Sequence, residues 1–363
     1  MKKTVLVTAI GSFAAQPVIA GCRRLGFRVV GCDIYPAAWI VNSMEVDVFY
    51  QAPYASDRAA WKEFLVQVCR REQVELVMPL TDVEVDVLAD WQSASGKLGA
   101  TVCMSEPATV LLCRNKERME RFLSGRNICP VIPGRRLSEF LEKESAPGLP
   151  AGPSDKNIPA GDDPALMHFP LVVKPVDGRS SQGLRIIETP RELSWAAELL
   201  KDQADRYLVQ EKLPGDVITV DVVRQPDTGA CVCLPRREIL RTPNGAGVSV
   251  QVFRDPGLEA RCQAVAAAVD IRGCVNFEFI QHAATGEWHF LECNPRFSGG
   301  VAFSVMAGYD MVKNHVNCFT GQELEAPGKI GSQYIARRYT EYRMEGAGSM
   351  GFCMKEDEND ENT

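Results

Sequence analysis

Two β-rich segments separated by a short turn constrain this chain more than any other part of its sequence. They cover residues 274–280 and 288–296, and the turn between them contains Gly286. Both are rich in β-branched and aromatic residues, which is the pattern of a β-hairpin. Each carries a glutamate among apolar neighbours, Glu278 in the first and Glu292 in the second. A buried carboxylate is costly unless a positive charge neutralises it, so the hairpin predicts a cation at this place.

The second segment adds a neutral oxygen and a guanidinium to these glutamates. Asn294 lies two residues after Glu292, so both side chains project from the same strand face. Two carboxylates and an amide oxygen suit Mg²⁺, a hard cation that commonly shares its shell with substrate phosphates. Arg296 follows on the same face and could hold an anion bidentately. From spacing alone, the alternative is an amphipathic hairpin whose glutamates face water.

Composition places the chain among ordinary globular proteins. At roughly 150 residues for each domain, 363 residues predict two to three domains. The net charge of −7 argues against a nucleic-acid partner, which would need a basic stripe. A run of about 18 apolar residues is lacking, so we expect no membrane partner either. Thirteen cysteines without paired metal spacing, and no secretory signal, predict free thiols and a cytoplasmic location.

The first part of the chain predicts a parallel sheet built from βαβ units. The expected strands are 4–9, 27–33, 76–80 and 100–104, and the expected helices are 16–25 and 61–72. The turn after the first strand holds one glycine, Gly11, where the dinucleotide fingerprint needs three. An NAD-dependent oxidoreductase is therefore a weaker alternative. Thr81, Asp82 and Glu84 follow the carboxyl end of a strand, where open α/β sheets bind ligands.

The remainder alternates strands and helices around one irregular segment, 142–166, whose composition indicates a mobile insertion or surface loop. The small-residue loop 176–183 joins two expected strands and could lay backbone N–H groups over phosphates; a plain flexible hairpin is the alternative. The expected strands are 129–132, 169–175, 184–187, 207–211 and 218–223. The expected helices are 107–112, 116–123, 190–203, 258–269, 303–308 and 311–319.

Five short motifs follow one another in a specific order. They are Lys116 before a helix, Val172-Val173-Lys174-Pro175, Gln210-Glu211-Lys212-Leu213-Pro214-Gly215, Asn276-Phe277-Glu278, and Glu292-Cys293-Asn294-Pro295-Arg296. Over about residues 1–325, this series resembles the ATP-grasp superfamily, and most nearly its carbamoyl-phosphate-synthase-like carboxylate–amine ligases. The resemblance implies an α/β chain with three parts.

The first implied part, 1–106, is a Rossmann-like pre-ATP-grasp domain. The second, 107–330, is an ATP-grasp domain of α+β type with a mobile lid at about 128–209 that carries the 142–166 insertion. The third, 331–363, is a C-terminal extension that ends in a disordered acidic tail, since its last residues lack an apolar pattern.

The resemblance also implies a nucleotide site for ATP. Lys116 and Lys174 would contact its phosphates, and Lys174 also the adenine edge. Glu211 and Leu213 would lie at the adenine, and the backbone of Lys212 and Leu213 would make the hinge hydrogen bonds. The loop that closes over the phosphates would include Asp177, Gly178, Ser180, Ser181 and Gly183.

One position departs from the family pattern. The family usually has a glutamate shortly after the Pro-Gly pair, where it binds the ribose hydroxyls. Val217 stands there in this chain, with Asp216 beside it. Asp216 is the candidate for the ribose contact from a shifted register.

The family's metal and catalytic roles carry over onto matching residues. Glu278, Glu292 and Asn294 would hold Mg²⁺, or Mn²⁺ in its place, between the phosphates. Arg296, together with Lys174 and Asn294, would stabilise the transferred phosphoryl group and the acyl phosphate.

The acceptor site is implied less directly. Gly299 and Gly300 would let the backbone approach the acyl group. Arg237 and Arg241 lie between the hinge and the hairpin, where the family faces the substrate carboxylate. They are candidate carboxylate clamps; a solvated basic edge is the alternative.

The implied function is that of an ATP- and Mg²⁺-dependent ligase. A substrate carboxylate would be activated as an acyl phosphate and then attacked by an amine or similar nucleophile. The partners would be small-molecule carboxylates and amines, and a homodimer is left open. The alternative from another class is a nucleotide-binding regulatory module or pseudo-enzyme that keeps the fold without turnover. Val217 favours this alternative, because it replaces the glutamate that the family usually has.

Overall fold

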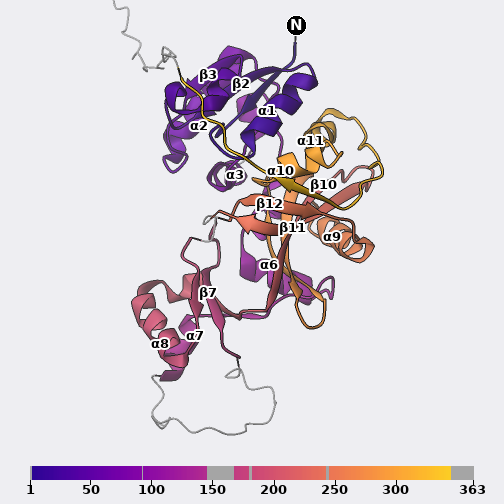
Figure 1. Cartoon of the computed structure of the whole chain (residues 1–363). Coiled ribbons are helices and arrows are strands. Elements are labelled where there is room, and N and C mark those ends of the chain that lie inside the picture. Colours follow the sequence, from indigo (N-terminus) through magenta and orange to yellow (C-terminus); the bar gives the residue numbers. More distant parts are fainter. Residues whose placement is uncertain (1, 92, 145–166, 180–181, 243–244, 345–363) are drawn as a thin grey trace, which may run out of the picture.

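The computed structural model describes residues 2–91, 93–144, 167–179, 182–242 and 245–344. Residues 145–166 of the expected insertion, the expected tail from residue 345, and Ser180 and Ser181 lie outside these residues. The described chain forms three sheets arranged in three tiers, with the N-terminal sheet at one end and a small lobe at the other (Figure 1). The boundaries expected at residues 106 and 330 stay predictions.

A five-stranded sheet in the order β3-β2-β1-β4-β5 forms the N-terminal tier, and every neighbouring pair is parallel. Its strands are β1 (Thr4–Val7), β2 (Arg28–Asp33), β3 (Val48–Gln51), β4 (Leu76–Met78) and β5 (Thr101–Val102). Its helices are α1 (Ala15–Arg24), α2 (Arg58–Glu72), α3 (Asp82–Ala89) and α4 (Ala94–Leu98). The predicted parallel sheet is therefore confirmed. The sequence analysis missed β3, α3 and α4.

The central tier is a six-stranded antiparallel sheet in the order β14-β13-β10-β11-β12-β15. Its strands are β10 (Gly215–Arg224), β11 (Cys231–Arg241), β12 (Gly247–Val252), β13 (Gly273–His282), β14 (Trp288–Asn294) and β15 (Gln333–Ala336). The helices of this tier are α5 (Pro107–Cys113), α6 (Lys116–Ser124), α9 (Pro256–Ala268), α10 (Val301–Met306) and α11 (Met311–Thr320). Strands β13 and β14 form the predicted hairpin, in a register that pairs Glu278 with Glu292 and Asn276 with Asn294.

A four-stranded antiparallel sheet in the order β6-β9-β7-β8 carries the small lobe. Its elements are β6 (Gly134–Arg136), α7 (Ser138–Glu144), β7 (Leu171–Pro175), β8 (Arg185–Ile187), α8 (Pro190–Leu199), a 3₁₀ helix (Lys201–Arg206) and β9 (Tyr207–Glu211). The strand expected at 129–132 is wrong, since Val131 makes only an isolated bridge to Phe290. Pro130 lies within this segment and Pro133 follows it, and neither has an N–H group to donate to a sheet.

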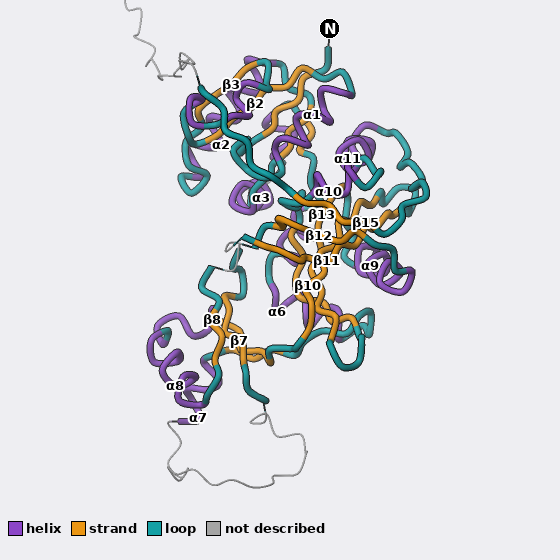
Figure 2. The backbone as a smooth tube through the Cα atoms, in the orientation of Figure 1, coloured by secondary structure: helices purple, strands orange, loops and turns teal. Residues whose placement is uncertain are grey.

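The N-terminal and central tiers share one hydrophobic core. Val5 and Val7 of β1 belong to the same buried cluster as Val250 and Val252 of β12. The small lobe has a separate cluster, which includes Leu171, Val173 and Val209. The tube view shows the corresponding arrangement, with β7 and β8 standing away from the other two sheets (Figure 2). The two larger tiers thus form one packed body, and the small lobe is attached beside it.

Two further observations apply to the described residues. The cysteines in the described ranges are free thiols, and most are buried. Within the same ranges, no helix is long and apolar enough to cross a membrane.

Candidate nucleotide and carboxylate site

Two glutamates of the β13–β14 hairpin face each other where two cavities meet. Glu278 and Glu292 are register partners, and both line each of the two cavities, which have volumes of about 380 and 230 Å³. Burial and the neighbouring Glu292 raise the pKa of Glu278, which is paired with Arg241 at 3.3 Å. Burial also opposes ionisation of Glu292, but Lys116 and Lys174 outweigh it and lower its pKa. The pair therefore holds a negative charge that depends on nearby cations.

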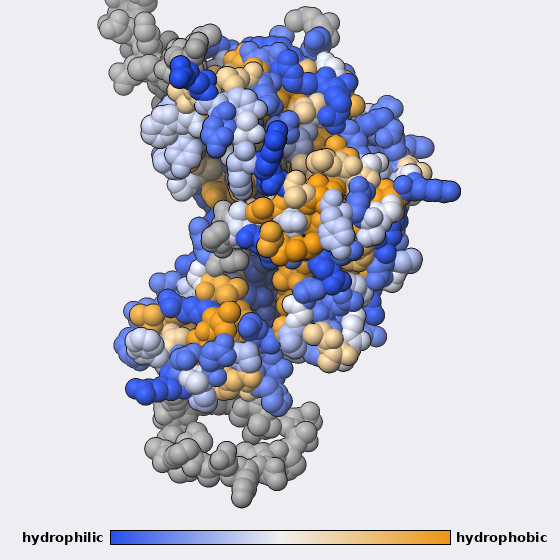
Figure 3. Space-filling view, viewed as in Figure 1, coloured by the Kyte–Doolittle hydropathy of each residue, from blue (hydrophilic) through white to orange (hydrophobic). Residues whose placement is uncertain are grey.

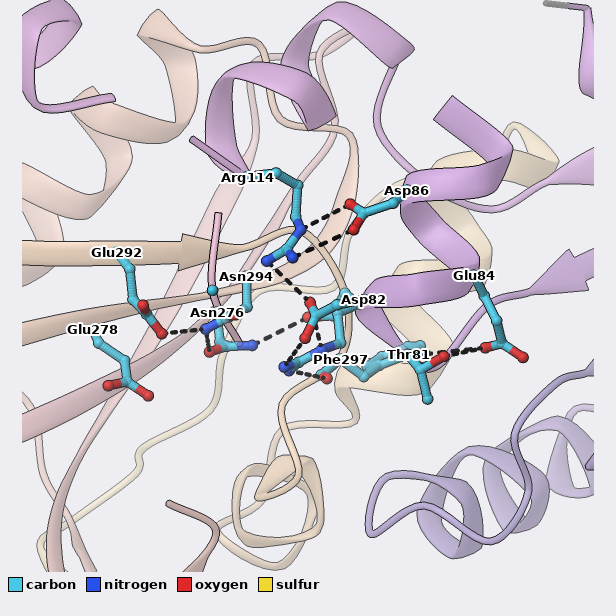
Figure 4. Close-up of polar contacts among 12 residues, drawn as sticks. Thr81, Asp82, Glu84, Asp86, Arg114, Asn276, Glu278, Glu292, Asn294 and Phe297 are labelled. Carbon is cyan, nitrogen blue, oxygen red and sulfur yellow. Dashed lines mark hydrogen bonds and ion pairs between the residues drawn. The ribbon is translucent and has the colours of Figure 1, made fainter. Parts of the chain in front are cut away.

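The two carboxylates of this pair suit a hard divalent cation. Asn294 donates from Nδ2 to Glu292 at 3.2 Å and to Asn276 at 3.2 Å (Figure 4), so its amide nitrogen faces Glu292, and its oxygen would reach a cation there only after the amide turns over. Among the described residues, no group of three or more His, Cys, Asp or Glu side chains converges on a metal position. A Mg²⁺ ion held by Glu278, Glu292 and Asn294 would therefore need phosphate and water oxygens to complete its shell, which is its usual behaviour with nucleotides.

Two lysines lie on the small-lobe side of the glutamates. Lys116, at the start of α6, lies 3.1 Å from Glu292 and donates at 2.8 Å to the backbone carbonyl of Gly178. Lys174, near the end of β7, lines the 230 Å³ cavity together with Lys116. Burial and the charge of Lys116 lower the pKa of Lys174 to about 8. The lysines expected to contact phosphates thus lie together, although they come from different elements.

The 230 Å³ cavity lies between the small lobe and the central sheet, where the space-filling view shows a hollow (Figure 3). Its apolar wall suits a flat ring and is made of Ile132, Val172, Leu184, Leu213, Ile280 and Leu291. Glu211, Lys212 and Leu213 also line it, as the hinge prediction requires. The Lys212 N–H already donates to the carbonyl of Pro170 at 2.9 Å, which leaves the backbone of Leu213 as the better hinge candidate.

The structure does not bring the expected ribose residue to this cavity. Val217 lines the cavity, whereas Asp216 pairs with Arg237 at 2.7 Å on the exposed side of β10. Successive residues of a strand point to opposite faces, so the two side chains separate. We therefore do not carry the ribose role of Asp216 into the proposal.

The structure describes the two ends of the loop that is expected to close over the phosphates. Gly178 lines the 230 Å³ cavity, and Gly183 adopts a φ of +74°, a region that favours glycine. The side chain of Asp177 lies 3.7 Å from Arg206, and its carbonyl accepts a hydrogen bond from Arg114 at 3.3 Å. Ser180 and Ser181, which the prediction included, lie outside the described residues.

The 380 Å³ cavity is rich in arginines and adjoins the glutamate pair. Arg179, Arg236, Arg241 and Arg296 line it, together with Gly299 and Gly300. Arg236 was not among the predicted residues; it is buried and pairs with Asp221 at 2.8 Å and with Glu238 at 3.0 Å. Asp82, Glu238, Glu278 and Glu292 line it as well, so a cation bound at the two glutamates would leave the arginines an excess of positive charge for an anionic substrate.

Arg237 and Arg241, predicted as a pair of clamps, are separated by the structure. Arg241 lines both cavities, whereas Arg237 reaches Asp216 at 2.7 Å and Gln281 at 3.0 Å, away from either lining. The pairing of β11 with β12 is irregular between Glu238 and Leu240 and again between Leu240 and Arg241. These irregularities break the strict alternation of side chains, and Arg241 comes to line the same cavity as Arg236.

Arg296 is held by a residue from the N-terminal tier. Asp82, at the start of α3, accepts from Arg296 at 2.9 and 3.2 Å. Arg114 lies 3.6 Å from Asp82 and 2.8 Å from Asp86, so it stands between two carboxylates (Figure 4). Burial opposes ionisation of Asp82, but Arg296 and Arg114 lower its pKa. In the sequence, only the position of Asp82 after β4 singled it out. That position predicted a ligand site and not a contact with Arg296.

Comparisons with known proteins agree with this architecture. Residues 203–342 match a family model described as ATP-grasp in the biosynthetic pathway with Ter operon. A formate-dependent phosphoribosylglycinamide formyltransferase of Synechococcus sp. (strain CC9902) is 27% identical over 242 residues, covering 64% of this chain and 53% of that protein. The carbamoyl phosphate synthase large chain of Clostridium beijerinckii is 26% identical over 207 residues, covering 53% of this chain and 19% of that protein.

The fold itself is shared with solved structures. Biotin carboxylase from Campylobacter jejuni, solved as a β,γ-ATP complex, superposes with a TM-score of 0.69 at 16% identity. The superposition covers 90% of this chain and 72% of that one, and at this identity it shows the fold alone. The chain spans about half the length of the formyltransferase that it matches. The order of motifs and the three sheets agree with the family match over residues 203–342, and the chain resembles ATP-grasp proteins in both sequence and fold.

Proposed function

We propose that this chain is an ATP- and Mg²⁺-dependent ligase that activates a substrate carboxylate as an acyl phosphate. The observation that carries the proposal is that two chemically different cavities meet at Glu278 and Glu292. One cavity combines an apolar wall with two lysines, which suits a nucleoside triphosphate, and the other is lined by arginines, which suits a carboxylate. In this proposal, the shared border would bring the γ-phosphate within reach of the carboxylate.

The residues would act by position and charge rather than by forming a covalent bond. Lys116 and Lys174 would bind phosphate oxygens, and Arg296, oriented by Asp82, would stabilise charge on the transferred phosphoryl group. A bound Mg²⁺ would supply Lewis-acid neutralisation of the phosphate oxygens. Arg236 and Arg241 would hold the carboxylate in place of the expected pair Arg237 and Arg241.

We also propose the step that follows formation of the acyl phosphate. Attack on the acyl phosphate by an amine, with formation of a C–N bond, is supported by the names of two matched proteins, a formyltransferase of phosphoribosylglycinamide and a carbamoyl phosphate synthase chain. The small lobe would act as the lid that excludes water from the acyl phosphate. The expected homodimer stays a prediction.

The test is a pair of measurements on the full chain. We expect ATP with Mg²⁺ to raise the melting temperature and NAD to leave it unchanged. We also expect release of ADP and phosphate to depend on one carboxylate in a screen of small carboxylic acids with and without amines. Binding of ATP without turnover for any carboxylate would favour the regulatory module, and binding of NAD instead of ATP would favour the oxidoreductase.

A further inference from the structure

A third cavity, of about 730 Å³, lies in the N-terminal tier and is larger than either cavity of the candidate site. Its walls come from the segments that follow four parallel strands: Gly11 after β1, Tyr35 after β2, Tyr54 after β3 and Val83 after β4. All four segments leave the carboxyl edge of the sheet, which is where open parallel sheets bind ligands. None of the roles proposed above uses this cavity.

Three aromatic side chains stand at its wall and are exposed. Tyr35 is 48% exposed, Trp39 73% and Tyr54 61%. The rings of Tyr35 and Trp39 lie 6.0 Å apart with 33° between their planes. Large apolar side chains gathered at a cavity are a common sign of a binding site, and aromatic rings favour flat or cationic ligands. We call this cavity the aromatic pocket.

The charge of the aromatic pocket restricts what it can hold. Among the described residues that line it there is no lysine or arginine, and its two carboxylates, Asp33 and Glu84, are each only 6% exposed. Asp33 accepts from the N–H groups of Gly11 at 2.7 Å and Tyr35 at 3.1 Å, and Glu84 accepts from Thr81. A phosphate would find no cationic side chain there, whereas a neutral or positively charged group would meet no repulsion.

The aromatic pocket adjoins the candidate site. Ser12, Thr81 and Val83 line both the aromatic pocket and the 380 Å³ cavity. Asp82, between Thr81 and Val83, is the residue that holds Arg296. In the described part of the chain, the Ser12 hydroxyl is buried and has no hydrogen-bond partner, so a polar group passing between the cavities could bind it.

We propose that the aromatic pocket binds the nucleophilic substrate, a small amine with an aromatic or large apolar body and no phosphate group. The inference rests on the proposed function, because the amine would attack the acyl phosphate formed in the neighbouring cavity. Its nitrogen would bond to the carbonyl carbon, the C–O bond to phosphate would break with its electron pair leaving on the phosphate, and the amine proton would pass to that phosphate or to water. The chain would thus differ from the matched formyltransferase, whose name gives a phosphoribosyl acceptor.

Calorimetric titration with probes of defined chemistry tests the proposal. Tryptamine and phenethylamine represent aromatic amines, and ribose 5-phosphate represents a phosphorylated acceptor. We expect both amines to bind and ribose 5-phosphate not to bind. Trp39→Ala and Tyr54→Ala should each weaken amine binding about tenfold, because each removes a ring contact. Trp195→Ala is the matched control, since Trp195 is 79% exposed on α8 of the small lobe, and it should leave binding unchanged.

Titration with ATP and Mg²⁺ on the same samples separates this inference from the proposed function. Amine binding that is lost in the pocket variants, with unchanged ATP binding, supports the inference. Stronger binding of ribose 5-phosphate than of the amines, or amine binding unaffected by both pocket variants, would overturn it. So would light scattering that shows a dimer dissociating in Trp39→Ala, because the rings would then serve contact between copies. Failure of ATP to bind would reject the proposed function but leave the amine measurement valid.

Discussion

Lys116 and Lys174 both lower the pKa of Glu292, but their own environments differ. Lys116 forms an ion pair of 3.1 Å with Glu292, whereas burial leaves Lys174 with a pKa of about 8. Glu278 is balanced from the other side by Arg241. Residue-scale changes at this place should therefore alter phosphate and metal binding before they alter folding.

Glu292→Gln should remove turnover while leaving the fold intact. The amide keeps the shape but loses the negative charge that a divalent cation needs, and we expect kcat to fall by about a hundredfold or more. Glu287→Gln, in the exposed hairpin turn, is the control. Circular dichroism and ADP release check both variants. A folded Glu292→Gln protein with near-normal turnover would remove Glu292 from the metal site.

Affinity for ATP should decrease as pH rises through about 8, the pKa to which burial and Lys116 lower Lys174. A lysine is charged below its pKa, so the contact with phosphate is present at lower pH and is lost above it. Titration calorimetry at about pH 7 and about pH 9 should show roughly tenfold weaker binding at the higher pH. Lys174→Arg stays charged over this range and should flatten the dependence. Equal pH dependence in both proteins would contradict the assignment.

Asp82→Asn should lower kcat without changing ATP affinity, because Asp82 orients Arg296 and does not line the nucleotide cavity. Loss of a charge-assisted contact of about 1.5–3 kcal/mol corresponds to roughly a ten- to hundredfold decrease. Asp90→Asn is the control, since Asp90 lies at the other end of α3 and pairs with Arg58 at an exposed position. Steady-state kinetics and ATP titration on the same samples show whether kcat falls while the affinity for ATP stays unchanged. A parallel loss of ATP binding would indicate a scaffold role instead.

At the scale of elements, strand β11 decides which arginines reach the site. A regular strand would place Arg237 and Arg241 on one face. The irregular register with β12 changes this, so Arg236 and Arg241 line the 380 Å³ cavity and Arg237 does not. Bulges of this kind depend on the partner strand, and β12 was not among the predicted strands.

Arg241→Ala and Arg237→Ala form a matched pair that tests this arrangement. Arg241→Ala should lower kcat/KM for the carboxylate by roughly ten- to a hundredfold, because it loses a charge-assisted contact. Arg237→Ala should change it little, since Arg237 pairs with Asp216 outside the cavity. Carboxylate-dependent ADP release measures both. Equal losses in the two variants would mean that the bulge does not separate their roles.

For the whole molecule, the shared core joins the N-terminal tier to the central tier. Helix α1 packs against α11, and a Cβ atom on Gly21 would lie 2.6 Å from the side chain of Val312. This contact holds the N-terminal tier, with Asp82 at the start of α3, against the central tier, in which Arg296 follows β14. The geometry of the site therefore depends on packing between parts of the chain that are distant in sequence.

Gly21→Ala should destabilise the protein, because the added methyl group forces Val312 or the helices apart. Overpacking of this kind costs about 1–3 kcal/mol. Gly96→Ala is the control, since a Cβ there meets nothing within 4 Å. Thermal unfolding of both variants and of Gly21→Ala with Val312→Ala measures the effect. The double variant should lose less stability than the sum of the single ones, and strict additivity would show that the two residues do not contact.

The sequence by itself determined the parallel N-terminal sheet, the glutamate hairpin and most helices. These depend on local periodicity and on residues close in the chain. It also indicated the resemblance to the ATP-grasp superfamily and the set Lys116, Lys174, Glu278, Glu292 and Asn294, whose members the structure places around adjoining cavities. The roles of these residues stay predictions.

Only the tertiary structure decided which distant residues meet. Asp82 and Arg296 are separated by 214 residues, and their ion pair exists because α3 and the end of the hairpin converge across the shared core. The bulges of β11 depend on β12, and the aromatic pocket depends on four strands ending at one edge of a sheet. Ion pairs, bulges and cavities arise from packing between elements, and local periodicity carries no information about that packing.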